Sequence, residues 1–418
     1  MTKKRQIEQP KREVTRRQLS RWQQQQRRER IIRRIGISII VAVLGIVGVG
    51  WYITHYQPLL QTVIKVNDTK FNMDYYVEAL AFYSAGQPVY LYASEVVIDI
   101  ERNELIRQEA EGLGITVSND AVEEELKSHD PPFNNVHRAE IRSRMLLGEL
   151  RDEYFEQRVP LFAEQRHIMA MLLESESQAT EVRARLESGE GFGELAGELS
   201  LEGLSQATNG DLGWHSRDVL AELLATAIPG EYAFGADVGV LSQPIYDEEI
   251  IKGVGYWLVE VLERREDSDE AHVRVIMLGS EQEAQVVKVR LEAGDDFATL
   301  AEELSQHEAS KGSGGDLDWL TPGMMSPALA EFVVDSEVEE VSEPIRDDVV
   351  VTTEGYWLLR VLDKDDNGEI SNDDRDLLKS MALNEWFSAL WDDPENEIDD
   401  SYLDDEKKAW AVEKAMGS

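Results

Sequence analysis

Hydrophobic and polar positions divide the chain into segments of three kinds. The first kind is an uncharged run, since no Asp, Glu, Lys or Arg occurs from Ile35 to Ile64, and its most apolar part is residues 35–56. At about 1.5 Å per residue, a helix of this length spans a hydrocarbon core of about 30 Å. The 13 Lys and Arg of residues 1–34 precede it. The pattern predicts a single-pass anchor at 35–56 in the cell membrane, with a basic cytoplasmic tail and the remaining chain outside. A cleaved signal peptide is the alternative.

The second kind of segment carries apolar residues at helical spacing. In residues 57–164 a short apolar strand is followed by four apolar residues at i, i+3, i+4 and i+7: Met73, Tyr76, Val77 and Leu80. Asn72 and Ser118 are suited to helix N-caps. We therefore expect a small, mostly helical domain at 57–164. Residues 371–418 combine a last helix, which has one apolar side, with an acidic tail after Asp392 that we expect to be mobile. A short helix is expected at residues 407–416.

The third kind is an internal repeat with a constant offset of 105 residues, in which residues 178–214 match residues 283–319. Each copy contains an amphipathic helix, Leu-Glu-x-Gly, a second helix with Phe-x-x-Leu-Ala, a serine and Gly-Asp-Leu-x-Trp. About forty residues later each copy closes with Gly-Tyr-Trp-Leu. This mixture of strand and helix patterns predicts two copies of one α+β domain, at residues 165–263 and 271–363.

Composition narrows the function classes. The net charge is −40, and because residues 1–34 contribute +10, the rest of the chain carries −50. An acidic body argues against nucleic acid as a partner, because phosphates are bound by clustered Lys and Arg. The sequence has no cysteine, which excludes disulfides, thiolate chemistry and Cys-based zinc sites. No cofactor is expected.

One acidic segment has the spacing of a calcium loop. Its candidate oxygen ligands are Asp363, Asp365, Asn367 and Asp374. Gly368 stands at the sixth position, as such loops require, but position 12 is Asp rather than Glu and a strand precedes the segment. The alternative is a linker in which Ser371 and Asp374 cap the last helix.

The order of motifs in each copy resembles the parvulin-type peptidyl-prolyl isomerases. Arg166-His167-Ile168 resembles the family's opening strand, and Gly-Asp-Leu-Gly followed by Gly-Tyr-x-Leu resembles its later elements. The layout of anchor, helical domain, two parvulin-like domains and C-terminal helix is similar to the SurA, PpiD and PrsA folding factors. The resemblance covers about residues 60–395. It implies two small antiparallel sheets with flanking helices, and a last helix that packs on the N-terminal domain.

The resemblance also implies a site in each copy. An X-Pro amide rotates over a barrier of about 18–20 kcal/mol. An enzyme lowers this barrier by holding the proline ring in an apolar pocket and by favouring the twisted carbonyl with polar groups. In copy one, His167 matches the first family histidine and Glu202 stands near the family's Cys or Asp. The implied substrate-binding residues of copy one are Leu212, Leu220, Leu224 and Trp257, the last in place of the second histidine.

Copy two is expected to be the weaker catalyst. We match Val275 to the first histidine and Trp357 to the second, while His307 lies in the loop near the Cys or Asp position. Its implied apolar pocket is Leu317, Met325 and Leu329. Without the motif, a lone histidine such as His167 and both tryptophans would be interpreted as core residues.

These features predict a membrane-anchored folding factor for exported proteins. It would bind unfolded or nascent polypeptides outside the cytoplasm and isomerise prolyl bonds, mainly in residues 165–263. Two alternatives remain: a non-enzymatic holdase, in which both copies only bind peptides, and an adaptor that assembles envelope machinery. The sequence leaves the clients and the oligomeric state open.

Overall fold

The computed structural model describes residues 16–84, 87–129, 133–265 and 268–417. The chain divides into two compact units, one formed by the chain up to Tyr154 together with Leu383–Ser418, and the other by Phe155–Ala382. Residues 1–15 of the predicted basic tail lie outside the described residues. Helix α1 (Arg16–His55) contains one stretch, Arg33–His55, that is long and apolar enough to cross a membrane.

The first unit is mostly helical, as predicted. After the 3₁₀ turn η1 (Gln57–Leu60), its elements in chain order are β1 (Thr62–Val66), β2 (Thr69–Asn72), α2 (Met73–Ser84), η2 (Val89–Tyr92), α3 (Glu95–Gly112), α4 (Asn119–Leu126), α5 (Asn135–Glu149) and the π-turn η3 (Leu150–Phe155). Both predicted N-caps are confirmed. The Asn72 side chain accepts a hydrogen bond from the Tyr75 amide, and Ser118 accepts one from the Ala121 amide.

The C-terminal segment completes this unit. The last long helix is α15 (Asn372–Asp392), and it is followed by β11 (Ile398–Asp399) and α16 (Asp405–Met416). The predicted packing is confirmed, because Leu390 is buried in the core of the first unit. The expectation of a mobile acidic tail is wrong, because β11 pairs with β1. The helix expected at residues 407–416 is present as α16, and its Ala411 and Ala415 are buried in the same core. Apolar residues spaced four apart anchor this short helix despite its acidic surroundings.

The second unit contains two four-stranded antiparallel sheets with the same strand order. The first sheet is built from β3 (Phe162–Leu173), β4 (Asp211–His215), β5 (Ile245–Lys252) and β10 (Thr352–Glu369), in the order β4-β3-β10-β5. The second is built from β6 (Gly255–Arg264), β7 (Ala271–Leu278), β8 (Asp316–Leu320) and β9 (Ile345–Asp347), in the order β8-β7-β6-β9. We name residues 162–252 with 352–369 the outer domain, and residues 255–347 the inner domain.

Helices flank both sheets. Those of the outer domain are α6 (Glu176–Glu187), α7 (Phe192–Leu199), α8 (Gly203–Ala207), α9 (Arg217–Leu224) and α10 (Ile228–Gly235). Those of the inner domain are α11 (Glu281–Glu292), α12 (Phe297–Leu304), α13 (Glu308–Lys311), η4 (Pro322–Met324) and α14 (Pro327–Asp335). The predicted α+β class with small antiparallel sheets is confirmed.

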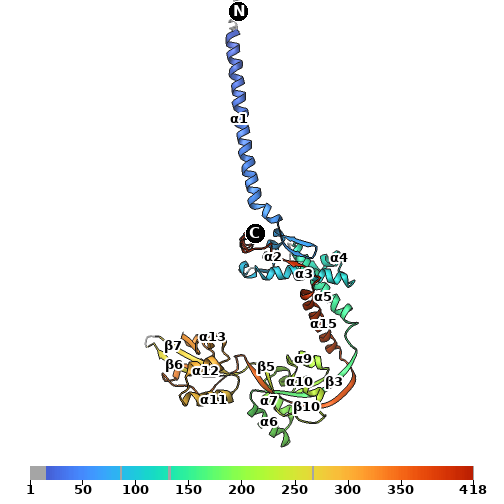
Figure 1. Cartoon of the computed structure of the whole chain (residues 1–418), viewed down its shortest axis with the longest axis vertical. Helices are drawn as coiled ribbons and strands as arrows, with labels where there is room; N and C mark the ends of the chain where they lie inside the picture. The colour runs from blue at the N-terminus through green and yellow to red at the C-terminus, as the bar shows by residue number, and fades with distance from the viewer. Residues whose placement is uncertain (1–15, 85–86, 130–132, 266–267, 418) are drawn as a thin grey trace, which may run out of the picture. The chain divides into compact units, whose positions relative to one another are not determined.

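The closing strands are exchanged between the two sequence repeats. Strand β6 follows copy one in sequence but pairs with β7 of copy two, and β10 pairs with β3 and β5 of copy one. Figure 1 shows the orange β10 with the green strands of the outer domain, and the yellow β6 beside β7. The inner domain is therefore one continuous segment inserted into the outer domain. Each of the predicted ranges, 165–263 and 271–363, therefore contains the closing strand of the other domain's sheet.

The two closing strands have equal registers in their respective sheets. Trp357 lies opposite Ile245 in the outer sheet, and Trp257 lies opposite Ile345 in the inner sheet. Both strands begin with Gly-Tyr-Trp-Leu. Because the two strands present the same side chains in the same register, the local sequence does not select between the two pairings.

The segment with calcium-loop spacing does not form a loop in the structure. Strand β10 stays extended to Glu369, with Asp363 opposite His167 and Asp365 opposite Gln165. Residues in a strand advance by about 3.3 Å each, so these carboxylates are spread along the strand instead of surrounding one ion at about 2.3–2.6 Å. The alternative is confirmed for Ser371, whose hydroxyl accepts the Asp374 amide at the start of α15 at 3.1 Å.

Candidate functional site

The two faces of the outer sheet carry different residues. Ile168, Ala170 and Leu172 point to one face, where they share a buried cluster with Trp357. Successive strand residues alternate between faces, so Met169 and Met171 point to the other face, which α6 and α7 cover. The same clusters recur in the inner domain, with Val275 beside Trp257 on the face that corresponds to the first.

His167 belongs to the face opposite the predicted apolar pocket. It lies directly across from Trp214, and its Nε2 is 2.7 Å from Oδ1 of Asp211. Burial alone would raise the pKa of Asp211, but hydrogen bonds from His167 and from the Gly213 amide lower it. His167 is therefore paired with a carboxylate at one end of the sheet, and the structure does not place it with Leu212, Leu220 and Leu224.

The inner domain repeats this pair. Nε2 of His272 is 2.8 Å from Oδ1 of Asp316, and His272 lies across from Trp319. His272 is 105 residues after His167, so the two histidines are equivalents, whereas Val275 corresponds to Ala170. Matching Val275 to His167 was therefore an error. The constant offset of the repeat was the signal that would have identified His272.

Glu202 serves as a helix cap. Its two carboxylate oxygens accept hydrogen bonds from the amides of Leu204 and Ser205, at 2.7 and 2.6 Å, at the start of α8. Because both carboxylate oxygens accept backbone amides, the capping of α8 is a sufficient reason for a Glu at this position. The equivalent residue at the offset of 105 is His307, which begins α13.

The apolar residues predicted for copy one form a closed core. Leu212, Leu220 and Leu224 are 7%, 0% and 2% exposed, and they pack with the fully buried Trp357. The indole Nε1 of Trp357 donates to Asp247 at 2.9 Å. Several further apolar side chains cover the cluster: Leu201, Leu204, Ile228, Tyr232 and Phe234. We call this group the outer cluster.

The apolar residues predicted for copy two are more accessible. Leu329 is buried, but Leu317 and Met325 are only partly buried against it. Trp257 joins them, and its Nε1 donates to Oδ2 of Asp347 at 3.0 Å. Trp257 was expected beside Leu212, and the strand exchange places it here instead. We call Trp257, His307, Leu317, Met325 and Leu329 the inner site.

His307 supplies the inner site with a polar side chain. Its ring lies edge-on to Trp257, with the ring centroids 5.3 Å apart, and its Nδ1 is 2.7 Å from the Ser310 hydroxyl. Burial lowers the pKa of His307 below its usual range, so the ring is neutral at pH 7. A neutral imidazole can donate or accept a hydrogen bond beside an apolar surface.

Asp347, which accepts the hydrogen bond from Trp257 of the inner site, stays ionised. Burial alone would raise its pKa, but hydrogen bonds from Ser326, the Val349 amide and Trp257 lower it. The hydrogen bond between Trp257 and Asp347 thus occupies the indole donor. Over the described part of the chain, no group of three or more His, Asp or Glu is arranged to hold a metal ion.

Comparison with known proteins identifies both repeats. Residues 167–262 and 256–365 each match a family model described as a PPIC-type PPIASE domain. The two matches overlap within β6, the strand that sequence assigns to copy one and the structure to the inner domain.

Curated relatives are folding factors. The chain is 28% identical over 207 residues to the chaperone SurA of Chromohalobacter salexigens, covering 46% of this chain and 44% of the relative. It is 26% identical to SurA of Hahella chejuensis, covering 64% and 67%. It is 39% identical over 90 residues to the foldase PrsA of Geobacillus kaustophilus, covering 22% and 30%. The chain thus spans from about a third to two thirds of the length of these relatives. The crystal structure of PrsA from Bacillus anthracis aligns with 12% identity, 78% and 95% coverage and a TM-score of 0.20.

Proposed function

Because both repeats match models of the PPIC-type PPIASE domain, we propose that this chain is a membrane-anchored folding factor that binds unfolded exported polypeptides and isomerises their prolyl bonds at the inner site. The observation that carries this proposal is the contrast in access. Leu317 and Met325 are partly exposed beside a neutral His307, whereas Leu212 and Leu220 of the outer cluster are buried.

The inner site has the parts that amide rotation needs. Leu317, Met325 and Leu329 offer an apolar surface for a proline ring. Rotation about the X-Pro bond breaks amide resonance. The carbonyl oxygen and the nitrogen of the twisted amide therefore form different hydrogen bonds from those of the planar amide. His307, held at Nδ1 by Ser310, leaves Nε2 as the ring nitrogen available to a twisted amide. No covalent bond forms in this reaction.

The expectation that copy one is the main catalyst rested on His167 having no counterpart in copy two. His272 removes that argument. The contrast between the outer cluster and the inner site now favours the inner domain, and we propose the outer domain as the frame that holds it.

The test is prolyl-isomerase activity of the full chain in a non-ionic detergent, measured on a short Leu-Pro peptide. Met325→Arg places a charge in the inner site, and Met324→Arg, at a neighbouring side chain that is 69% exposed, is the matched control. Losing the burial of one apolar side chain removes about 1.5–3 kcal/mol of binding, so roughly a tenfold or larger loss is expected for Met325→Arg. Equal activity of the two variants contradicts the assignment.

A non-enzymatic holdase is the second candidate. Its support is that Ala170 and Val275 stand on the apolar faces, and that both closing-strand tryptophans have their indole donors occupied by Asp247 and Asp347. Wild-type chain that suppresses client aggregation without accelerating the Leu-Pro peptide would establish this reading.

We also propose that residues 35–56 anchor the chain with its N-terminus in the cytoplasm. The support is the single apolar stretch of α1 and the basic residues that precede it. Protease added outside intact cells should digest the folded units and leave a fragment that contains α1. Full protection of the folded units contradicts this topology.

A further inference from the structure

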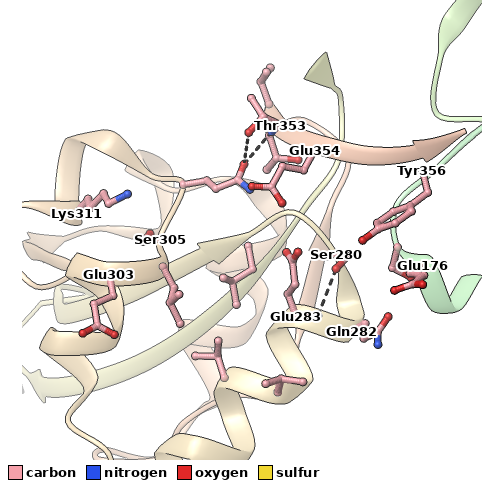
Figure 2. A pocket seen from close by; sticks show the side chains of 18 of the residues that line it. Glu176, Ser280, Gln282, Glu283, Glu303, Ser305, Lys311, Thr353, Glu354 and Tyr356 are labelled. Atoms are coloured by element: carbon pink, nitrogen blue, oxygen red, sulfur yellow. Dashed lines mark hydrogen bonds between the residues drawn. The ribbon is translucent and has the colours of Figure 1, made fainter. Parts of the chain in front are cut away.

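A cavity of about 900 Å³ lies at the junction of the outer and inner domains. One side is lined by α11 and the end of α12 of the inner domain. The other is lined by Thr353, Glu354 and Tyr356 of β10 and by Glu176 at the start of α6. Figure 2 shows these residues around the space, with Lys311 and Glu303 at one end and Tyr356 and Glu176 at the other. We call this cavity the junction groove.

The groove exists because the closing strands are exchanged. Strand β10 leaves the inner domain beside the groove and enters the outer sheet, so Thr353 pairs with Ile251 while Tyr356 pairs with Tyr246 and Leu173. If β10 instead closed the inner sheet, these groove residues would belong to that sheet. The groove is therefore distinct from the inner site, which none of its lining residues enters.

Buried polar contacts fix the groove's base. Lys252 is 2% exposed, and its amine donates to the carbonyls of Thr353 (2.5 Å) and Glu354. The Gln306 side chain accepts the Thr353 amide at 2.8 Å, the contact drawn as a dashed line in Figure 2. These contacts hold the start of β10 against the end of β5 and against the segment that follows α12, so the groove is preformed and a ligand need not order it.

Exposed apolar side chains line the groove. Ile251, Val286 and Val351 are 66%, 57% and 63% exposed, and Leu304 is 37% exposed. They come from separate segments of the sequence: the end of β5, α11, the segment before β10 and α12. A shared lining of apolar side chains that water still reaches marks a binding surface.

The charges of the lining are mostly negative. Five glutamates line the groove: Glu176, Glu283, Glu303, Glu308 and Glu354. The cations among the lining residues are Arg290 and Lys311, and Arg290 donates to Asp295 at 2.8 Å. A ligand that complements this surface carries apolar side chains together with Lys or Arg.

We propose that the junction groove is a second polypeptide-binding surface, which holds an extended client segment of alternating apolar and basic residues without any need for proline. This proposal rests on the proposed function, since it assumes an unfolded polypeptide as the client. The groove holds the client at the junction, while prolyl bonds are isomerised at the separate inner site.

The probe is a fluorescent 12-residue peptide of alternating Leu and Arg without proline, and its binding to the full detergent-solubilised chain is followed by anisotropy. Val286→Arg is compared with Val289→Arg, because Val289 is on the same helix and 55% exposed but does not line the groove. Val286→Arg should weaken binding at least about tenfold, and Val289→Arg by less than about twofold. Equal weakening by both variants overturns the proposal.

A second pair tests the charges. Glu303→Lys is compared with Glu302→Lys, an exposed neighbour on α12 outside the lining. Glu303→Lys should weaken binding more in about 0.05 M salt than in 1 M salt, where the Debye length is only about 3 Å. A probe with Glu in place of Arg should bind the wild-type chain less tightly. Equal affinity of the acidic and basic probes overturns the proposal.

Isomerase assays separate the two proposals. Val286→Arg should retain wild-type activity on the Leu-Pro peptide while losing the proline-free probe. If the wild-type chain lacks isomerase activity but binds the probe in the groove, the catalytic proposal fails and the groove proposal stands. If Val286→Arg loses the Leu-Pro activity to the same extent as probe binding, the groove is not a separate surface.

Discussion

The outer and inner domains share one strand order, but their apolar clusters differ in access. In the outer cluster Leu220 is fully buried, whereas Met325 in the inner site is partly exposed. Glu202 uses both carboxylate oxygens to cap α8, whereas its equivalent His307 turns its ring toward Trp257. Two copies of one fold thus present a filled core and an open surface.

The two copies also differ in length beside these positions. The offset between the copies falls from 105 at Trp214 and Trp319 to 100 at Gly255 and Gly355, so the outer domain has five more residues in this stretch. The outer domain forms α10 there, and its Ile228, Tyr232 and Phe234 pack over the outer cluster. The inner domain has η4 and α14 in this region, where the outer domain has α9 and α10.

The largest effect is expected in a disulfide test of which strand closes which sheet, because the bond either forms or does not form. Glu260 of β6 lies opposite Arg274 of β7, and opposite residues have Cα atoms about 4.5–5.5 Å apart, within the range for a disulfide. In a chain without native cysteines, Glu260→Cys with Arg274→Cys should oxidise to one intramolecular bond. Glu260→Cys with Met169→Cys should not form this bond, and mapping of the cross-linked peptides by mass spectrometry checks both. A bond between Cys replacements at 169 and 260 contradicts the exchange.

The next largest effect is a difference in the free energy of unfolding between a substitution in the outer cluster and one in the inner site. Leu220→Ala removes a fully buried side chain and should lower the free energy of unfolding by about 2–5 kcal/mol. Met325→Ala removes a partly exposed side chain, so it should cost less than about 2 kcal/mol and yet reduce isomerase activity more. Urea unfolding and the Leu-Pro assay measure the two quantities. A larger stability loss at Met325 than at Leu220 reverses the contrast.

The two domains should respond to pH in opposite directions. Burial lowers the pKa of His307, so the unfolded state binds more protons and the inner domain loses stability as pH falls below the unfolded value of about 6.5. For His215, burial alone would lower the pKa, but its hydrogen bond to Asp374 raises it. That contribution is fully present below about pH 6.5 and is lost as pH rises through the raised value.

Single substitutions separate these two effects. His307→Gln should flatten the acid side of the stability profile, and His215→Gln should flatten the side above about pH 6.5. Urea midpoints measured across this range with each variant give the profiles. Identical changes from both substitutions would show that the two histidines do not act as the structure indicates.

The smallest effects are expected at the histidines outside both apolar groups. The His167–Asp211 and His272–Asp316 pairs are each partly exposed, so each should contribute about 0–1 kcal/mol to stability. His167→Ala and His272→Ala should each leave Leu-Pro isomerase activity within about twofold of wild type. A loss of activity in His167→Ala alone would restore the outer domain as the catalyst.

Local patterns predicted the elements but not the partners of the closing strands. The caps at Asn72 and Ser118 follow from short-range hydrogen bonds and could be predicted directly. The exchange of β6 and β10 could not, because both carry Gly-Tyr-Trp-Leu and fit either sheet in one register. The exchange in turn hid which tryptophan belongs to which site.

The site residues divide in the same way. Leu317, Met325 and Leu329 were predicted as a group and are brought together in the inner domain. His272 was overlooked although the repeat offset indicates it. Helix α10 packs over the outer cluster through tertiary contacts. The spacing of apolar residues along one helix does not predict such contacts.

A prolyl peptide should bind beside Trp257 and not beside Trp357. Both indoles donate to a buried aspartate, Trp257 to Asp347 and Trp357 to Asp247, so each N–H should give a distinct NMR signal in the chain labelled with ¹⁵N-tryptophan. The two signals are assigned with Trp257→Phe and Trp357→Phe. Addition of the Leu-Pro peptide should shift the Trp257 signal and leave the Trp357 signal in place, and a Leu-Ala peptide should shift it less. A shift of Trp357 alone would contradict the account.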